Sequence, residues 1–323
     1  MNRTLLFILK VVVSAGLLVY LLQSVDLADV YRHFVEGDHE LFGVSVVIYF
    51  VVVILSTVRW MVLLRAVGGQ ADFRKLTESY MVSAFFANFL PSNVGGDVVR
   101  VQEAAKAAGS HTASLAVAAV DRIAGFVALY FIAAPAFLFG GPALRGLSGA
   151  RFILIGLTAL FSVMGVLFLR AGLVTRIVEI IGLKRLPWVY EKFATLQAAI
   201  QSFRQSKAAL VKAFLLSLVL QFLGVSYFYF VARALRIPLD LGVALLMVPL
   251  CVLIQALPIS FNGWGVREGV YVLYFRQVGL PKESALAFSI VAAALVVLLS
   301  ISGLLVWLAR RSETTPPADP ALS

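Results

Sequence analysis

Two short polar segments interrupt apolar stretches of the chain, and their residue types are suited to binding an anion. The first, residues 90–100, reads LPSNVGGDVVR, and the second, residues 257–268, reads LPISFNGWGVRE. Each runs from Leu-Pro through Asn to two closely spaced glycines, and then to an arginine that begins an apparent helix. Proline ends the preceding helix, while glycine accepts positive φ and lets another group approach the backbone. The free N–H groups and positive dipole end of the next helix favour an anion such as a phosphate.

Ionisable side chains accompany both segments and also interrupt the apolar stretch of residues 112–139. Charges at membrane depth are costly and mark functional sites by default. An arginine there can bind a phosphate through two parallel hydrogen bonds, and a carboxylate can balance that charge or select a cationic headgroup. The predicted substrate-binding residues are Asn93, Gly95, Gly96, Asp97, Arg100, Asp121, Arg122, Asn262, Gly263, Gly265, Arg267 and Glu268.

Other interpretations of these residues stay open. Proline, glycine and asparagine are common in ordinary loops between short helices. Asp121 and Arg122 point about 100° apart on a helix, so they do not simply pair with each other. They either brace the two segments through ion pairs or contact substrate. Arg59 and Trp60, near the end of another apolar stretch, are predicted to be interface anchors rather than site residues.

The composition excludes a water-soluble enzyme or a soluble nucleic-acid-binding protein. Hydrophobic residues make up 61% of the 323 residues and charged residues 14%, and the mean hydropathy is +0.95. Soluble domains have roughly 45–50% apolar and about 25% charged residues. The single cysteine, Cys251, cannot form an intramolecular disulfide. The sequence has no phosphate-binding P-loop, no His-Glu-x-x-His motif, no nucleophile elbow and no Cys/His cluster, so we expect neither a metal nor a cofactor.

The apolar stretches predict an all-α polytopic membrane protein. About 20 apolar residues are needed to span a bilayer. The predicted spanning helices cover residues 5–22, 41–64, 112–139, 152–169, 208–231 and 284–308. Two further apolar stretches, residues 76–90 and 242–257, stop at the polar segments. The first stretch of the chain has no small-x-small cleavage site after it and is predicted to be a retained helix.

Loop charges predict the orientation of these helices. Basic residues gather at residues 65–75, 170–207 and 310–311, whereas residues 26–40 are mainly acidic. Because basic loops stay cytoplasmic, both chain termini are predicted to be inside, and the net charge of +10 follows mainly from topology. We call the two apolar stretches that stop at a polar segment, residues 76–90 and 242–257, the broken stretches. The first broken stretch then enters and leaves the membrane from the cytoplasmic side, and the second does so from outside.

Each broken stretch is therefore a re-entrant hairpin or a pair of short crossings. Interrupted segments that enter from opposite faces are typical of an inverted-repeat transporter. We expect one membrane domain over residues 1–311, with halves of about 1–150 and 151–311, and a disordered cytoplasmic tail over residues 312–323.

The motifs together resemble the lysylphosphatidylglycerol synthase transmembrane-region (flippase-like) family of bacterial and archaeal inner-membrane proteins. The resemblance rests on Arg59-Trp60, on LPSNVGGDVVR at residues 90–100, on DRIAG at residues 121–125, and on Leu-Pro through GWGVREG at residues 257–269. It implies a polytopic domain that translocates, or is suspected of translocating, anionic or amino-acylated lipids. In the namesake enzymes a soluble aminoacyltransferase domain follows the membrane part. Here only a short tail follows Arg311, so we expect no synthase activity, and the identity of the lipid stays open.

The function predicted from these patterns is translocation of a polar, anionic or amino-modified lipid across the inner membrane, without enzymatic chemistry. The two segments would meet near the membrane midplane, where Arg100 and Arg267 would hold a phosphate. One alternative is a membrane-embedded transferase acting on a lipid-linked headgroup, with Asp97, Asp121 or Glu268 as base. A non-transporting scaffold is another. The expected partners are membrane lipids and not nucleic acid, and homo-oligomer formation stays open.

Overall fold

The structure is a computed structural model. It describes residues 32, 34–70, 72–89, 100–102, 105, 111–140, 144, 146–147, 149–169, 203, 206–256 and 263–313, with backbone only for 89, 111–112, 162–169 and 311–313. The described part of the chain is α-helical and contains no strand. Its helices are α3 (His39–Ala66), α4 (Phe73–Phe89), α6 (His111–Phe139), α8 (Ala150–Leu169), α11 (Lys207–Ala234), α12 (Leu241–Gln255), α13 (Val266–Gln277) and α14 (Lys282–Glu313).

Four of these helices are long and apolar enough to cross a membrane, namely α3, α6, α11 and α14. They confirm the spans predicted at residues 41–64, 112–139, 208–231 and 284–308. The span predicted at residues 152–169 lies in helix α8, whereas the one at residues 5–22 lies outside the described residues. The predicted tail over residues 312–323 also falls almost wholly outside them.

Two aspartates determine where α3 and α12 begin. Asp38 Oδ1 accepts hydrogen bonds from the backbone N–H groups of Glu40 and Leu41, at 3.0 and 3.2 Å. Asp240 Oδ1 does the same for Gly242 and the residue after it, at 2.8 and 3.2 Å. These N-caps satisfy donors that the first helical turn leaves unpaired.

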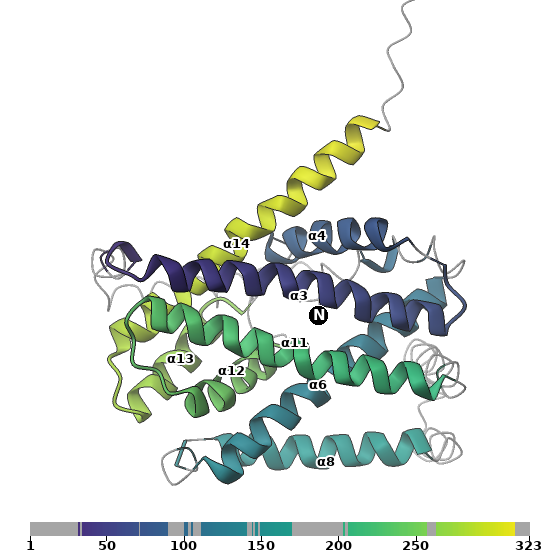
Figure 1. Ribbon diagram of the computed structural model, residues 1–323. Helices are drawn as coiled ribbons and strands as arrows, with labels where there is room; N and C mark the ends of the chain where they lie inside the picture. The colour runs from purple at the N-terminus through teal and green to yellow at the C-terminus, as the bar shows by residue number, and fades with distance from the viewer. Residues whose placement is uncertain are drawn as a thin grey trace, which may run out of the picture.

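Helices α3, α8 and α11 lie roughly along one direction, whereas α6 and α14 run obliquely to them (Figure 1). Helices α3 and α11 lie side by side and run in opposite directions, with α4 near the end of α3 and α12 and α13 near its beginning. Helix α4 packs against α14, and α12 packs against α6. The main buried core surrounds Tyr271, Tyr274 and Phe288, and a smaller one surrounds Trp60 and Leu63.

Helices α12 and α13 form an antiparallel pair that is too short to cross a bilayer. The Cys251 sulfur on α12 lies 4.0 Å from the backbone oxygen of Arg267 on α13. Nearer the connection, a Cβ at Gly263 would lie 2.8 Å from the side chain of Gln255. At about 1.5 Å per residue, α12 and α13 are roughly 22 and 18 Å long, against about 30 Å of hydrocarbon.

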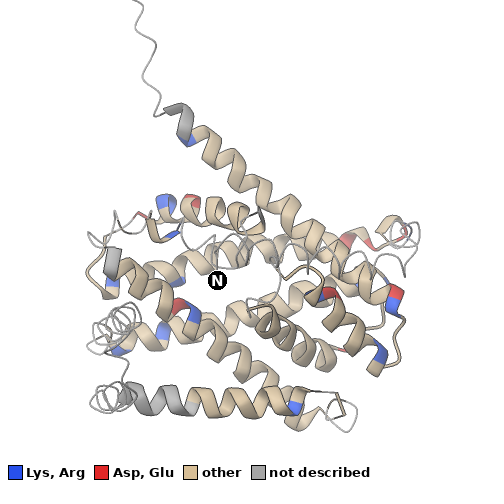
Figure 2. Cartoon of the chain, turned by 180° about the vertical axis from the view of Figure 1, so that it is seen from behind, with Lys and Arg blue, Asp and Glu red and all other residues tan. Residues whose placement is uncertain are grey.

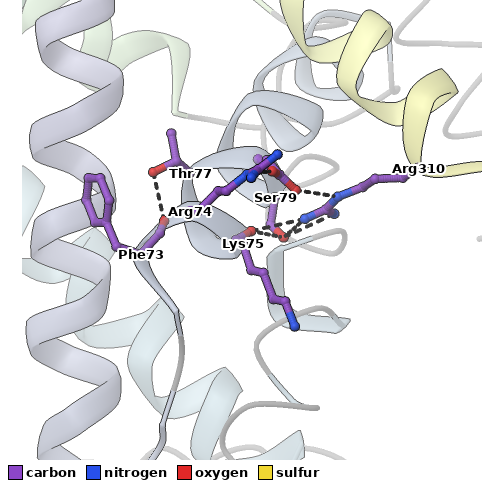
Figure 3. Close-up of polar contacts among 7 residues, drawn as sticks. Phe73, Arg74, Lys75, Thr77, Ser79 and Arg310 are labelled. Atoms are coloured by element: carbon purple, nitrogen blue, oxygen red, sulfur yellow. Dashed lines mark hydrogen bonds and ion pairs between the residues drawn. The ribbon is translucent and has the colours of Figure 1, made fainter. Parts of the chain in front are cut away.

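Helix α4 is held along its length by α14. The Arg310 guanidinium lies 3.0 Å from Glu78 Oε2 and donates to the backbone oxygen of Lys75 at 3.1 Å and to Ser79 Oγ at 3.5 Å (Figure 3). At the other end of α4, Asn88 donates to Ser300 Oγ at 3.0 Å. These contacts fix the position of α4, whose middle contributes a ring to the site described next.

Between these polar contacts, the backbones of α4 and α14 approach each other closely. A Cβ at Gly303 would lie 2.0 Å from the backbone oxygen of Met81, so only glycine permits this approach. The rings of Phe86 and Trp307 meet edge to face beside it, with centroids 5.8 Å apart.

Candidate functional site

Two groups of charged side chains are buried in the helix bundle, whereas most described charges lie near helix ends (Figure 2). We call the first the Asp121 cluster; it comprises Arg59, Trp60, Tyr80, Arg100, Asp121 and Ser217. We call the second the Glu268 cluster; it comprises Trp264, Gly265, Arg267, Glu268 and Ser289.

Two guanidinium groups converge on one carboxylate in the Asp121 cluster. Arg59 Nε lies 2.7 Å from Asp121 Oδ1, and Arg100 Nη1 lies 3.8 Å from Oδ2. Arg59 also donates from Nη1 to Ser217 Oγ at 2.8 Å. The side chains of Arg59, Asp121 and Arg100 are 9%, 5% and 10% exposed, so all three charges are largely withdrawn from solvent.

Two aromatic rings face Arg100 in this cluster. Its guanidinium carbon lies 4.4 Å from the centroid of the Trp60 ring and 5.0 Å from that of Tyr80. Such contacts stabilise a cation electrostatically through the ring faces. Since α3, α4, α6 and α11 each contribute a side chain, the cluster exists only while four helices stay in register.

One pair of atoms in the Asp121 cluster is close but not aligned for hydrogen bonding. Arg59 Nε and Asp121 Oδ1 are both buried, and neither has a hydrogen-bond partner, although they lie 2.7 Å apart. The N–H of Arg59 therefore does not point at the carboxylate oxygen beside it. Buried polar atoms normally have partners, so such a pair calls for a further polar group.

The Glu268 carboxylate, by contrast, is surrounded by aligned donors. Its Oε2 accepts from the backbone N–H of Gly265 at 2.7 Å. Its Oε1 accepts from Ser289 Oγ and from Arg267 Nε, both at 2.9 Å, and also from Arg267 Nη2. Arg267 Nε additionally lies 3.0 Å from Ser289 Oγ. Glu268 is fully buried, and its charge is met by hydrogen bonds on both oxygens.

The glycines before α13 have the conformation that the sequence predicts. Gly263 has φ of +80° and Gly265 has φ of +81°, in the left-handed region that favours glycine. Trp264 between them places its ring 4.7 Å from the Arg267 guanidinium carbon. Because Glu268 accepts from the Gly265 N–H, this chain's own carboxylate occupies the amino end of α13.

The structure brings the predicted site residues together in two places rather than one. Arg100 and Asp121 belong to the first cluster, and Gly265, Arg267 and Glu268 to the second. Gly263 precedes the second, and Arg122 lies half-buried on α6 next to the first. The remaining predicted residues, Asn93, Gly95, Gly96, Asp97 and Asn262, lie outside the described residues.

The prediction for Arg59 and Trp60 is wrong. These residues are 7% and 3% exposed and belong to the Asp121 cluster, so they do not anchor the protein at the membrane interface. The same rule that singled out Asp121 as a charge within an apolar stretch could have singled out Arg59. Nothing in the sequence distinguished Tyr80, Ser217 or Ser289 from other polar residues of apolar helices.

The residues that the structure describes hold no group of three or more histidine, cysteine or acidic side chains that could bind a metal ion. The chemistry that both clusters offer consists of hydrogen bonding, charge pairing and cation–π contact.

A comparison with protein families gives a match over almost the whole chain. The model of the lysylphosphatidylglycerol synthase transmembrane region matches residues 7–306. The chain belongs to this family. No curated protein and no solved structure matches it.

As a member of the lysylphosphatidylglycerol synthase transmembrane-region family, with four helices able to cross a bilayer, the chain is a multi-pass membrane protein. Both clusters lie within the matched residues, and so do the two polar segments from which the prediction of a site began.

Proposed function

We propose that this family member translocates a polar lipid across the inner membrane and that the Asp121 cluster contacts the lipid headgroup. The observation that carries the proposal is a group of three ionisable side chains, from three parts of the chain, buried among apolar helices. Burying such charges costs several kcal/mol per ion unless the pairing is excellent. The pairing of Arg59 with Asp121 is not aligned, so stability alone is a poor reason for the cluster.

We also propose that the two halves form an inverted repeat, which would support a transport function. In the pairing we propose, α3, α4 and α6 of the first half correspond to α11, α12 and α14 of the second. If each helix is replaced by its counterpart, the contact between α4 and α14 corresponds to a contact between α12 and α6. Both contacts are present. The arginine after each broken stretch also contacts the next long helix, Arg100 at Asp121 on α6 and Arg267 at Ser289 on α14.

The proposed orientation has α4 entering from the cytoplasm and α12 from outside, as re-entrant elements. The shortness of α12 and α13 supports this, as does the placement of α4 and the α12–α13 pair near opposite ends of α3 in Figure 1. A headgroup would then reach the Asp121 cluster from the cytoplasmic side and leave past the α12–α13 pair. Irregular backbone at membrane depth is compatible with such a wet, protein-lined path.

The two arginines that were predicted to hold a phosphate have different roles in this proposal. Arg100 is held by ring faces and a carboxylate oxygen 3.8 Å away, contacts that a phosphate can join or replace. Arg267 donates to Glu268 and Ser289, which favours a bracing role for it in the turn before α13.

The experiment is a translocation assay with the purified protein in liposomes. The vesicles contain phosphatidylglycerol, phosphatidylethanolamine or phosphatidylcholine with a fluorescent label on one acyl chain. Dithionite added outside the vesicles reduces the label, and the fraction of label that becomes accessible to dithionite is measured over time. We expect faster access than in protein-free vesicles for at least one of these lipids. We also expect Asp121→Asn to slow it and Glu283→Gln, which removes an exposed ion pair with Lys282 that belongs to neither cluster, to leave it unchanged.

Mass spectrometry of the same lipids separates the alternatives. Lipids that cross unmodified support translocation, whereas a changed headgroup mass would support the transferase. If no lipid crosses faster with folded protein than without it, the translocation proposal fails and the scaffold is favoured.

A further inference from the structure

A third group of charged side chains joins α4 to α14 at the surface of the protein, outside both buried clusters. Glu78 on α4 shares its carboxylate between two arginines. Its Oε1 accepts from Arg74 Nε and its Oε2 from Arg310 Nε on α14, both at 3.0 Å. Arg310 also donates to the backbone oxygen of Lys75 at 3.1 Å (Figure 3). We call Arg74, Glu78 and Arg310 the α4–α14 latch.

The latch is weak enough for other charges to open it. The side chains of Glu78 and Arg310 are 25% and 30% exposed, and that of Arg74 is 87% exposed, so lipid headgroups can reach all three. Ion pairs this exposed add little to stability. The attraction of one arginine to an anionic leaflet is of about the same size. Since the latch has two cations and one anion, its net positive charge favours such a surface.

Helix α4 connects the latch to the Asp121 cluster. Glu78 and Tyr80 are two residues apart, about 200° around the helix, so they lie on opposite faces. One face meets α14 through Glu78 and through the backbone of Met81, which Gly303 approaches closely. The other face places the Tyr80 ring 5.0 Å from the Arg100 guanidinium carbon. Cation–π contacts extend to about 6 Å, so a displacement of α4 by about 1 Å is enough to weaken this contact.

We propose that the α4–α14 latch senses negative charge on the cytoplasmic membrane surface and thereby regulates the Asp121 cluster. Anionic headgroups compete with Glu78 for the two arginines, by charge and not as substrates, and this end of α4 then moves away from α14. The contact of Asn88 with Ser300 at the other end of α4 stays in place, so α4 pivots and Tyr80 shifts relative to Arg100. This inference rests on the proposed function for the orientation of α4, and it names a regulation of the same site.

Ser79 provides a direct measure of latch opening. It is 6% exposed, and both Nη atoms of Arg310 lie 3.5 Å from its hydroxyl oxygen. In Ser79→Cys a thiol replaces this hydroxyl, and its reaction with uncharged N-ethylmaleimide is followed by mass spectrometry of the full-length protein. The chain's own Cys251 is fully buried, and the unaltered protein provides the blank.

The labelling is compared in nanodiscs of phosphatidylcholine alone and in nanodiscs with about one third of phosphatidylglycerol or phosphatidylserine. We expect Ser79→Cys to react about fivefold faster with either anionic lipid, since the attraction of one basic side chain to an anionic leaflet corresponds to about that factor. The direct effect of surface charge on the thiol has the opposite sign, because nearby negative charge disfavours the reactive thiolate. Acceleration by only one of the two anionic lipids would indicate a headgroup-specific site and overturn charge sensing.

Two variants show whether the acceleration arises at the latch. Glu78→Gln, combined with Ser79→Cys, removes the shared carboxylate, so labelling should already be fast in phosphatidylcholine and gain nothing from anionic lipid. Thr77→Cys is the matched control, because the Thr77 hydroxyl donates to the backbone oxygen of Phe73 in its own helix and not to α14 (Figure 3). An unresponsive Ser79→Cys, an equal acceleration in Thr77→Cys, or a response that persists in Glu78→Gln overturns the inference.

The outcome is separable from that of the proposed function, because labelling does not require transport. A protein whose Ser79→Cys labelling responds to anionic lipid, but which moves no lipid in the dithionite assay, would keep the charge-sensing latch and refute translocation. A protein that moves lipid while its labelling does not respond would keep translocation and refute the latch. Regulation itself is measured in the dithionite assay, where added phosphatidylserine should speed translocation by the unaltered protein and not by Glu78→Gln; an equal effect on both would overturn the regulatory role.

Discussion

The Asp121 cluster and the Glu268 cluster both bury an arginine against a carboxylate, but they are assembled from different numbers of helices. Arg267 and Glu268 are neighbours on α13, and α14 adds only the Ser289 hydroxyl. The Asp121 cluster draws on α3, α4, α6 and α11, and its Arg59 and Asp121 lie on different helices. An ion pair within one helix survives any movement of that helix, whereas a pair between helices breaks when they separate.

The carboxylates of the two clusters also differ in their hydrogen bonds. Glu268 has aligned donors on both oxygens, including the backbone N–H of Gly265, so its charge is satisfied internally. Asp121 Oδ1 has a guanidinium 2.7 Å away and no aligned donor. We propose from this comparison that the Glu268 cluster stabilises the turn before α13 and that the Asp121 cluster exchanges an internal partner for a ligand. The following predictions test that division.

Removing the carboxylate of the stabilising cluster should have the largest effect. Glu268→Ala leaves Arg267 and the Gly265 N–H without their acceptor, and breaking a buried pair in this way costs about 3–5 kcal/mol. The free energy of unfolding, measured by SDS titration in mixed micelles, should fall by that amount.

Replacing both charges of that cluster provides the control. Arg267→Met combined with Glu268→Leu leaves no unpaired buried charge and should recover part of the loss. If Glu268→Ala unfolds no more readily than the unaltered protein, Glu268 is not structural, and the contrast between the clusters disappears.

The corresponding change in the Asp121 cluster should affect transport more than folding. Asp121→Asn keeps the shape and one acceptor oxygen but removes the charge between Arg59 and Arg100. In the proposed site this carboxylate bonds to the lipid headgroup, and the loss of such a charge-assisted bond costs about 1.5–3 kcal/mol, so lipid translocation should slow by roughly ten- to a hundredfold. Unfolding free energy should fall less than in Glu268→Ala. If the Asp121→Asn variant is folded and transports lipid at an unchanged rate, the headgroup site does not lie in this cluster.

A steric change at α14 should reach the Asp121 cluster through α4. In Gly303→Ala the new Cβ would lie 2.0 Å from the backbone oxygen of Met81, beside Tyr80, so α4 must shift away. Overpacking of this kind costs about 1–3 kcal/mol, and transport should fall with it while the Glu268 cluster stays intact. Gly224→Ala on α11 is the matched control, because nothing lies within 4 Å of its added Cβ. Equal stability of the two variants would contradict the close approach of α4 and α14.

Most of the helical framework could be predicted from the sequence, because the thickness of the hydrocarbon layer sets how many consecutive apolar residues a spanning helix needs. The stretch predicted at residues 41–64 lies within His39–Ala66, and the one at 284–308 within Lys282–Glu313. The positive φ of Gly263 and Gly265 was also accessible, since few other residues suit such turns.

The partners of the charged residues could not be predicted in the same way. Apolar periodicity does not say which helices are neighbours, so the pairing of Arg59 with Asp121 required the packing of α3, α6 and α11. Serines on apolar helices carry an equally ambiguous signal, because their hydroxyls can bond to their own helix. Ser217 does so with Ala213 and still accepts from Arg59.

The smallest effects should come from two serines that occupy comparable places, and they sharpen the comparison most directly. Ser217→Ala and Ser289→Ala each remove one hydroxyl that accepts from an arginine, at 2.8 and 3.0 Å, and each should cost about 1 kcal/mol of unfolding free energy. Their effects on transport should differ. Ser217 holds Arg59 beside Asp121, so its loss should slow lipid translocation in the dithionite assay. Ser289 holds a pair that stays joined within α13, so Ser289→Ala should leave translocation unchanged. A reversed result, with translocation slowed only in Ser289→Ala, would assign the lipid site to the Glu268 cluster instead.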